Sequence, residues 1–303
     1  MDLTPTTKVL VTGASGSLGW TLSGMLAAKC RVSGTYLTRP QLPDGVAGVR
    51  LDLAGGASIA ELVTSLEPDV IVHAAAITDP DRCERDIGVA LAVNFEATGR
   101  LASAASRLGS RLVYVSTDLV FDGAKGNYRE SDQPRPLSVY GTSKLRGEEV
   151  ALEACPDALV IRSALIYGLA GPARGTFLGR MLDNLAEGRR VQLFTDQRRN
   201  PVLVDDLAAG VVMAIRRDLA GLYHLGGSEA ASRYQFGKAA CEVFECDQAL
   251  LVPVTMDDAV FPAKRPADAT LDIGKFVAAT GLAPCGLLEG LRRARAGGSA
   301  PDR

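Results

Sequence analysis

The sequence has few of the residues from which metal and disulfide sites are usually built. It contains only two histidines, His73 and His224, and they lie far apart along the chain. Its six cysteines include no pair separated by two residues, which is the spacing of zinc and thioredoxin-type motifs. We therefore expect no metal site, and we expect the cysteines to be free thiols in a reducing compartment.

Long apolar runs and an excess of charge of one sign are also absent. No run approaches the about 18 apolar residues that a membrane-spanning helix needs, and the start of the chain lacks the basic and apolar stretches of a signal peptide. The net charge is −2 and charged residues make up 22% of the chain, whereas nucleic-acid-binding domains are typically basic. These absences predict a cytoplasmic protein whose partners are neither membranes nor nucleic acids.

Short β-branched runs alternate with longer helical patterns in the first half of the chain. Most of the runs are largely apolar and do not alternate with polar residues, which is typical of strands in a parallel sheet that is covered by helices on both faces. This alternation predicts an α/β fold of the Rossmann type, with a doubly wound parallel sheet. The predicted strands are residues 9–12, 31–36, 70–73, 112–116 and 159–165, and the predicted helices are residues 18–28, 59–66, 89–108 and 140–154.

The pattern changes beyond Gly168, where the elements become shorter and glycine and proline become frequent. We expect residues 1–170, with a return at residues 202–226, to form a dinucleotide-binding domain. The rest of residues 171–303 would then form a smaller C-terminal α/β substrate-binding domain. Ser232 is placed to cap a helix that ends near Glu245. Further elements are predicted at residues 205–217 (helix), 221–225 (strand) and 287–295 (helix).

A glycine-rich loop follows the first predicted strand. Gly13, Gly16 and Gly19 are spaced three residues apart. In dinucleotide-binding folds such glycines allow a tight turn, a close approach to the pyrophosphate and close packing of helix on strand. The following helix N-terminus offers free N–H groups to the phosphates. The loop therefore predicts a dinucleotide site made by Gly13, Ser15, Gly16, Ser17, Leu18 and Gly19.

The region after this loop favours NADP(H) over NAD. Sites for NAD usually have an acid about 20 residues further on, but no acid occurs between Gly19 and Asp44. Arg39 stands beyond the second strand instead, and a cation there suits the 2′-phosphate of NADP. We expect Asp52 either to bind the adenine amino group or to cap a turn. The other residues that we assign to the cofactor site are Leu53, Ala74, Ala75, Ala76 and Asn94.

Tyr140 and Lys144 stand four residues apart on a predicted helix and so share one of its faces. A nearby ammonium lowers the pKa of a phenol, which would let the pair exchange a proton with a carbonyl or an alcohol while hydride moves. Tyr234 and Lys238 have the same spacing but lie in the second half of the chain. We therefore predict that Tyr140 and Lys144 are catalytic, and that the second pair is structural.

Two hydroxyl groups end the strand that precedes this helix. Ser116 and Thr117 lie at the carboxyl edge of the predicted sheet, where α/β proteins bind ligands. A hydroxyl there can donate a hydrogen bond to a substrate carbonyl oxygen, or it can cap the turn. We predict Thr117 as the third catalytic residue. His73 ends a neighbouring strand, and we interpret it as a structural residue.

These motifs resemble those of the extended short-chain dehydrogenase/reductases, and within that group the dTDP-4-dehydrorhamnose reductase family. The likeness extends over nearly the whole chain. It implies an NADP-dependent oxidoreductase that uses NADPH to reduce a 4-keto nucleotide-sugar, such as dTDP-4-dehydrorhamnose. The stretches that carry the likeness are residues 13–19, 74–78, 115–123, 140–148, 200–208 and 265–272.

The resemblance also implies roles for individual residues. Thr117, Tyr140 and Lys144 would form the catalytic triad, with Tyr140 protonating the C4 oxygen and Lys144 also holding the nicotinamide ribose. The family usually has tyrosine at the position of Leu119 and tryptophan at that of Leu165, so the wall that faces the sugar differs in this chain. The implied substrate-binding residues are Thr117, Leu119, Leu165, Asn200 and Arg265.

Two other functions stay open. One is a nucleotide-sugar epimerase or dehydratase with tightly held NAD, against which the missing acid after the second strand argues. The other is a non-catalytic NADP-binding regulatory subunit, because the β subunit of methionine adenosyltransferase resembles the same reductases. The resemblance is also compatible with a homodimer.

Overall fold

The chain folds around a seven-stranded sheet whose neighbouring strands are all parallel. The computed structural model describes residues 1–55, 57–169, 171, 175–258 and 261–297. The strand order is β11-β6-β5-β4-β1-β2-β3, so the winding reverses between β1 and β4. This order confirms the predicted doubly wound sheet. The strands are β1 (Lys8–Thr12), β2 (Arg31–Tyr36), β3 (Val46–Arg50), β4 (Val70–His73), β5 (Arg111–Thr117), β6 (Leu159–Ser163) and β11 (Gly221–Leu225).

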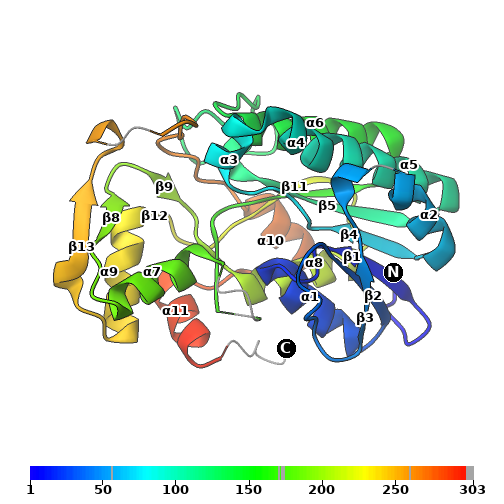
Figure 1. Ribbon diagram of the computed structural model, residues 1–303, viewed down its shortest axis with the longest axis horizontal. Helices are drawn as coiled ribbons and strands as arrows, with labels where there is room; N and C mark the ends of the chain where they lie inside the picture. Colours follow the sequence, from blue (N-terminus) through cyan, green and yellow to red (C-terminus); the bar gives the residue numbers. More distant parts are fainter. Residues whose placement is uncertain (56, 170, 172–174, 259–260, 298–303) are drawn as a thin grey trace.

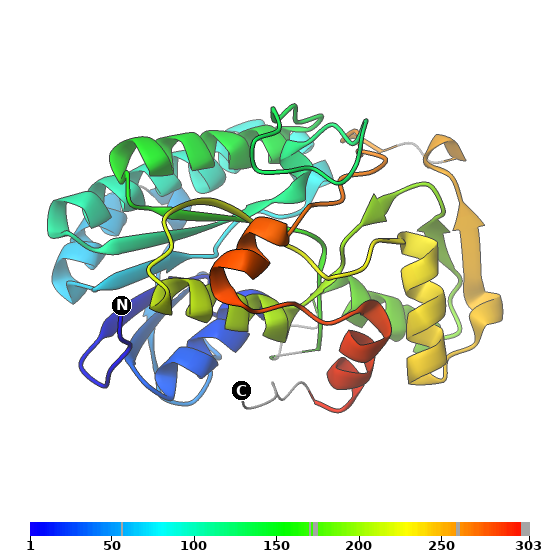
Figure 2. The same ribbon diagram turned by 180° about the vertical axis from the view of Figure 1, so that it is seen from behind.

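Helices cover both faces of this sheet (Figures 1 and 2). Because side chains alternate along a strand, Val9 and Val11 pack toward one group of helices, and Leu10 packs toward the other. No helix in the described part of the chain is both long and apolar enough to span a membrane. The first face carries α1 (Ser17–Ala27), α8 (Val204–Arg216) and α10 (Gly274–Thr280), and the second carries α2 (Ala57–Leu66), α5 (Ala97–Leu108) and α6 (Val139–Ala154).

The helix predicted at residues 89–108 is present, but its pitch changes in its first part. α3 (Pro80–Arg85) and α4 (Ile87–Leu91) are followed by a π-helical turn at Ala92–Glu96. Asn94 in this turn is fully buried, and its amide binds both the N–H and the carbonyl of Ile77, at 2.9 and 3.1 Å. We attribute the local change of helical pitch to this pairing, which turns Asn94 toward the loop after β4.

A smaller lobe (residues 175–199, 231–258 and 287–295) has its own apolar core and lies at the left of Figure 1. The helix predicted after Ser232 is present as α9 (Arg233–Phe244), and Ser232 and Gln235 form a capping box at its start. The other elements are α7 (Phe177–Ala186), β8 (Val191–Phe194), β9 (Arg198–Arg199), β12 (Ala231–Ser232), β13 (Leu251–Val254) and α11 (Leu287–Arg295), with β7 (Ile166–Tyr167) and β10 (Val202–Leu203) paired at the junction.

Alanine should have opposite effects on stability at two glycines of neighbouring helices. A Cβ at Gly147 in α6 would lie 2.2 Å from the hydroxyl of Tyr114, so Gly147→Ala should lower the free energy of unfolding by about 1–3 kcal/mol. A Cβ at Gly99 in α5 would meet nothing closer than Val150 at 3.7 Å, so Gly99→Ala should raise it by about 0.5–1 kcal/mol. Urea denaturation of the two variants measures both effects, and a shared sign would contradict this packing.

Candidate active site

The glycine loop joins β1 to α1 with very little space around it. Gly13 has a φ of +71°, which side chains rarely adopt, and a Cβ there would lie 2.8 Å from the Cα of Ala75. A Cβ at Gly19 would lie 2.1 Å from the carbonyl oxygen of Gly13. Glycine at these two positions therefore lets the loop lie directly against α1 and against the segment that follows β4.

The first turn of α1 is prepared for an anion. The helix begins at Ser17 with Gly16 as its N-cap, and no side chain caps its N–H groups. The Ser17 hydroxyl has a buried oxygen with no hydrogen-bond partner in the described chain. A phosphate at this helix end would satisfy the N–H groups and the hydroxyl together. The structure brings together the predicted residues Gly13, Ser15, Gly16, Ser17, Leu18 and Gly19, and they fit a pyrophosphate.

The loop after β4 is held by a chain of buried hydrogen bonds. The N–H of Ala75 donates to the Thr12 hydroxyl at 3.2 Å, which lies 2.7 Å from Nδ1 of His73. The other ring nitrogen of His73 lies 3.0 Å from the hydroxyl of Thr98. Burial and the charge of Lys144 lower the pKa of His73 to about 3, so the ring stays neutral. His73 therefore positions the backbone beside the glycine loop, in agreement with its predicted structural role.

The remaining predicted cofactor residues differ in how free their side chains are. Arg39 is exposed beyond the end of β2, and Leu53 is buried. Asp52 accepts a hydrogen bond from the Ala54 N–H at 3.0 Å, which is the turn-capping role foreseen for it as an alternative. The amide of Asn94 is bonded within the protein, so its direct contact with a cofactor stays a prediction.

Tyr140 lies in the first turn of α6 and is almost fully buried. Burial raises the pKa of its phenol well above the usual range, Asp118 and Cys83 add to the rise, and a hydrogen bond with Thr117 opposes it. In the protein without ligand, burial therefore outweighs any lowering of this pKa by Lys144. The phenol is neutral, which is the form that can donate a proton.

Lys144 points at an aromatic ring. Its Nζ lies 4.0 Å from the centre of the Tyr114 ring, which offers the ammonium a cation–π contact. Burial lowers the pKa of Lys144 to about 7, and the carboxylate of Glu148 acts in the opposite direction. Lys144 is thus close to the balance between its charged and neutral forms at neutral pH.

The two hydroxyls at the end of β5 serve different neighbours. Ser116 donates to Glu148 at 2.5 Å, and Glu148 also forms a buried ion pair with Arg162, with a shortest N–O distance of 2.7 Å. Thr117 donates to Asp118 at 3.1 Å and is the hydroxyl near Tyr140. The Ser116 hydroxyl is therefore occupied by a buried hydrogen bond to Glu148, and the Thr117 hydroxyl lies on the side of the predicted catalytic tyrosine.

Asp118 joins the end of β5 to the smaller lobe. Its carboxylate lies 3.1 Å from Nε of Arg199 on β9, and both side chains are only 4% exposed. Burial raises the pKa of Asp118, and the charge of Arg199 opposes that rise. The sequence analysis missed this pair. The Arg198-Arg199 doublet directly before the predicted substrate residue Asn200 is no specific signal, because the sequence contains three other Arg-Arg doublets.

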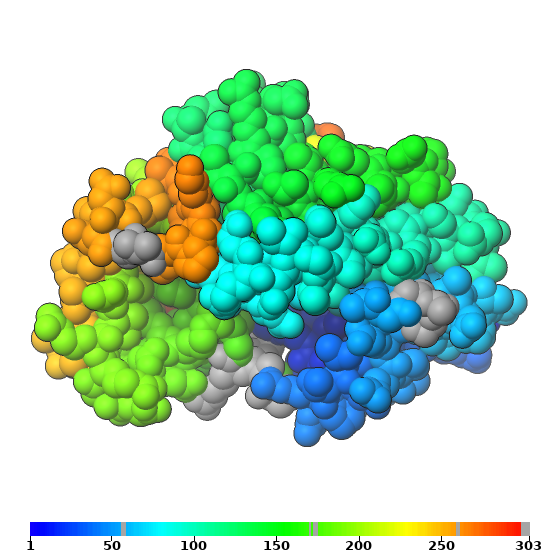
Figure 3. Space-filling model, turned by 45° about the horizontal axis from the view of Figure 1, so that its top comes forward, coloured from blue at the N-terminus to red at the C-terminus, as the bar shows by residue number. Residues whose placement is uncertain are grey.

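The predicted substrate residues lie at the junction of the two lobes. Figure 3 shows a hollow in the surface there, between the cyan segment that contains α3 and the yellow-green smaller lobe. Leu119 packs against the cluster around Tyr140, and Leu165 is half-buried between β6 and β7. Arg265 donates to Asp81 on α3 at 2.8 Å, so this pair bridges the hollow. Asn200 instead binds backbone groups with its amide and ties the chain together.

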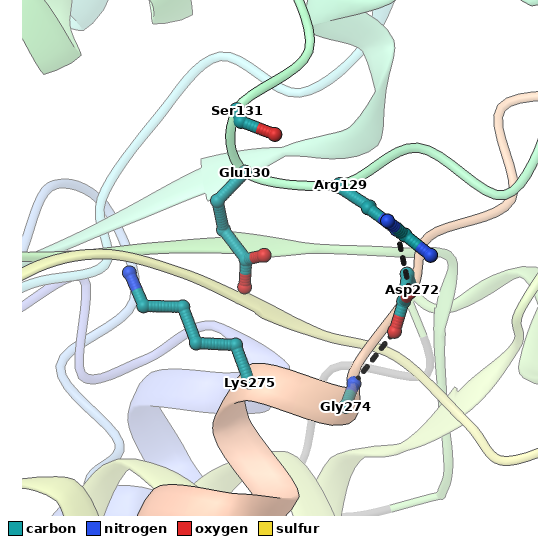
Figure 4. Close-up of a pocket in the computed structure, with 6 residues that line it drawn as sticks. All are labelled: Arg129, Glu130, Ser131, Asp272, Gly274 and Lys275. Atoms are coloured by element: carbon teal, nitrogen blue, oxygen red, sulfur yellow. Dashed lines mark hydrogen bonds and ion pairs between the residues drawn. The ribbon is translucent and has the colours of Figure 1, made fainter.

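Two features lie outside this site. Tyr234 and Lys238 are on α9 in the smaller lobe and do not join the Tyr140 cluster. A cavity of about 430 Å³ lies beside the edge strand β11 (Figure 4). There Glu130 accepts from the N–H of His224 and Lys275 donates to the carbonyl of Leu222, so both charges cover the strand edge. Within the described chain, no cluster of three or more His, Cys, Asp or Glu could hold a metal.

Comparison with known proteins gives consistent matches over the whole length. Residues 7–296 match the family model described as the RmlD substrate binding domain. The probable low-salt glycan biosynthesis reductase Agl14 of Haloferax volcanii is 34% identical, over 87% of this chain and 89% of that protein. The dTDP-4-dehydrorhamnose reductase of Aggregatibacter actinomycetemcomitans is 32% identical, over 95% and 98%.

Two further similarities bear on function. The methionine adenosyltransferase 2 subunit beta of Pongo abelii is 32% identical, over 90% of this chain and 82% of that protein. The crystal structure of dTDP-4-dehydrorhamnose reductase from Bacillus anthracis in complex with NADP superposes with a TM-score of 0.84. It is 26% identical and covers 96% of this chain and 99% of its own.

Removing the buried cation of Lys144 should stabilise the ligand-free protein in a pH-dependent way. The folded-state pKa of about 7 lies below the ordinary 10.5, so the burial penalty is complete below pH 7 and vanishes as the pH rises toward 10.5. Lys144→Met should therefore raise the free energy of unfolding most at about pH 6 and least at about pH 10. Urea denaturation across this range measures the trend.

The matched control is Lys238→Met, because the Lys238 side chain is exposed. Its effect on the free energy of unfolding should not follow this pH trend. A Lys144→Met effect that is constant with pH, or that grows as the pH rises, would contradict the assignment of a destabilising buried ammonium.

Proposed function

The chain belongs to the RmlD substrate-binding-domain family, and we propose that it uses NADPH to reduce the 4-keto group of a nucleotide-linked sugar, dTDP-4-dehydrorhamnose or a close relative. The observation that carries this proposal is the position of Tyr140, Thr117 and Lys144. All three lie beside the carboxyl ends of the strands, next to a glycine loop that fits a pyrophosphate.

The cofactor would lie across the switch point between β1 and β4. The α1 N-terminus with the Ser17 hydroxyl would bind its pyrophosphate, Arg39 would bind the 2′-phosphate, and the small residues Ala74–76 would leave room for the nicotinamide half. When bound, reduced nicotinamide supplies a hydride. The NADP complex of the Bacillus anthracis reductase supports this choice of cofactor.

The residues of this chain would provide the proton. Tyr140 is neutral and buried, so it is able to donate its hydroxyl proton to the C4 oxygen. Thr117 lies next to it and would orient the same oxygen. Lys144 lies one helical turn further on, where its positive charge would stabilise the phenolate that remains after the transfer.

The substrate would enter between α3 and the smaller lobe. Arg265 lies on this path and is placed to bind the nucleotide end of the substrate with its guanidinium. Leu119 and Leu165 would form an aliphatic wall for the sugar. Relatives with aromatic residues at these positions would stack on the sugar face, so the preferred keto-sugar is expected to differ in its substituents from dTDP-4-dehydrorhamnose.

A non-catalytic regulatory role is the second candidate. The similarity to methionine adenosyltransferase 2 subunit beta favours it. The sequence identity to that subunit is 32%, the same as the identity to the Aggregatibacter reductase. The presence of Thr117, Tyr140 and Lys144 favours an enzyme. The direct test is to mix the purified protein with NADPH and a panel of 4-keto nucleotide-sugars and to follow the NADPH absorbance. No oxidation with any of them would overturn the proposed reductase.

Replacing the two tyrosines should separate the catalytic pair from the structural one. Tyr140→Phe removes the proton donor and keeps the ring, so kcat should fall by roughly 100-fold or more, with NADPH affinity little changed. Tyr234→Phe on α9 is the matched control and should leave kcat nearly unchanged. Stopped-flow measurement of NADPH oxidation compares them, and a crippled Tyr234→Phe with an active Tyr140→Phe would place the active site elsewhere.

Arg39 should decide between the two nicotinamide cofactors. Arg39→Asp removes the cation for the 2′-phosphate and supplies an acceptor for a ribose hydroxyl, so the preference for NADPH over NADH should reverse, with NADPH bound about 10- to 100-fold more weakly. Lys29→Asp, at the opposite end of β2, is the matched control and should not alter the preference. Fluorescence titration with both cofactors gives the ratio, and an unchanged ratio in Arg39→Asp would refute this role.

A further inference from the structure

Three arginines of the smaller lobe and its junction converge near the end of β5. Strand β9 pairs antiparallel with β12, with Arg199 opposite Ala231, and Arg233 follows directly after β12. Nη1 of Arg199 donates to the carbonyl of Pro266 at 3.3 Å, which brings in the neighbouring Arg265. The pairing of these short strands therefore places three guanidinium groups at one end of the hollow between the lobes.

Two of these guanidinium groups have a carboxylate partner and the third has none. Arg199 is paired with Asp118 at 3.1 Å, and Arg265 is paired with Asp81 at 2.8 Å. Arg233 has only a neutral acceptor: its Nε donates to the side-chain oxygen of Gln197 at 3.1 Å. Its Nη1 is buried and has no hydrogen-bond partner among the described residues.

The surroundings of Arg233 make this lack of a counter-charge costly. Burial and the charges of Arg199, Arg265 and Arg180 lower its pKa to about 9, and Asp118 alone opposes them. Arg233 is also the first residue of α9, where the helix dipole already places positive charge. A partly buried cation in such a place is stabilised when an anion neutralises it.

We propose that Arg233 binds a phosphate of the nucleoside diphosphate part of the substrate, and that this phosphate is the missing counter-ion. The proposal rests on the proposed function. Its chemistry follows from the charges that act on Arg233: Arg199, Arg265 and Arg180 are positive, and Asp118 is the carboxylate that opposes them, which leaves an excess of positive charge. A diphosphate carries the negative charge that would neutralise such an excess.

The neighbours of Arg233 fix the direction of its guanidinium. The group lies 4.5 Å above the ring of Phe177, which holds the plane, and Gln197 fixes the Nε edge. Nη1 is the donor left over by these contacts. The Arg233 guanidinium is thus held by Gln197 on one edge and by the Phe177 ring on one face. Its remaining edge is suited to bind a phosphate.

The test uses calorimetric titration of the holo-protein, saturated with NADP, with dTDP, UDP and the phosphate-free nucleosides thymidine and uridine. Arg233→Met keeps a long apolar side chain against Phe177 but removes the charge. It should weaken binding of the preferred diphosphate by roughly 10- to 100-fold and leave nucleoside binding unchanged. Arg233→Lys, which keeps a positive charge, should lose less. Arg198→Met is the matched control, because Arg198 lies on β9 beside Arg199, is half exposed and is paired with Asp268.

A second measurement separates binding from a merely structural role. Because Arg233 is a partly buried cation without a carboxylate partner among the described residues, Arg233→Met should leave the melting temperature of the ligand-free protein unchanged or raise it. A structural arginine would instead lower the melting temperature when replaced. Loss of diphosphate affinity without loss of stability supports the proposal. Unchanged diphosphate affinity in Arg233→Met overturns it, as does a wild-type protein that binds neither diphosphate.

Failure of the proposed function gives a different result. A protein that binds dTDP or UDP through Arg233 but oxidises NADPH with no keto-sugar would support the phosphate site and overturn the reductase. A protein that reduces a keto-sugar while Arg233→Met binds the diphosphate normally would support the reductase and overturn the phosphate site.

Discussion

The carboxylate of Glu148 is the group on which the rest of the catalytic arrangement depends. It accepts from Ser116 at the end of β5 and pairs with Arg162 on β6, and it lies one helical turn after Lys144 on α6. One buried charge therefore fixes α6 to two strands of the sheet. Breaking such a pair costs about 3–5 kcal/mol, because it leaves an uncompensated buried charge. The same carboxylate offsets the burial of Lys144, so folding and the charge of the predicted catalytic lysine depend on one group.

Several strands of the central sheet could be predicted from the sequence, because the pattern that indicates each of them lies within the strand itself. Strands at residues 31–36, 70–73 and 221–225 agree with the structure to the residue, and the run at 70–73, Val-Ile-Val-His, is buried throughout. The predicted helix at residues 89–108 is helical throughout, but the π-helical turn in its first part was not predicted, because it depends on Asn94 turning toward Ile77. Nothing in the helical periodicity of that segment reveals a partner so far away.

The site itself was predictable only in part for the same physical reason. Glycine spacing and the Tyr140–Lys144 interval are local patterns, whereas the pKa values depend on what folds around them. In the protein without ligand, burial of the Tyr140 phenol outweighs any lowering of its pKa by Lys144, whose ammonium lies over the Tyr114 ring. The Asp118–Arg199 pair joins distant segments through a two-residue strand, and strands of that length carry no periodicity to detect.

Three consecutive residues at the end of β5 show how one strand serves both lobes. Ser116 points into the interior toward Glu148, Thr117 lies beside Tyr140, and Asp118 reaches Arg199 of the smaller lobe. The strand ends at Thr117 and Asp118 begins a 3₁₀ turn, so the chain changes direction there and the three side chains reach different neighbours. A shift of the smaller lobe would pull on Asp118 and thereby on Thr117, which donates to that carboxylate. The Thr117 hydroxyl therefore links the Asp118–Arg199 ion pair to Tyr140, the proposed proton donor.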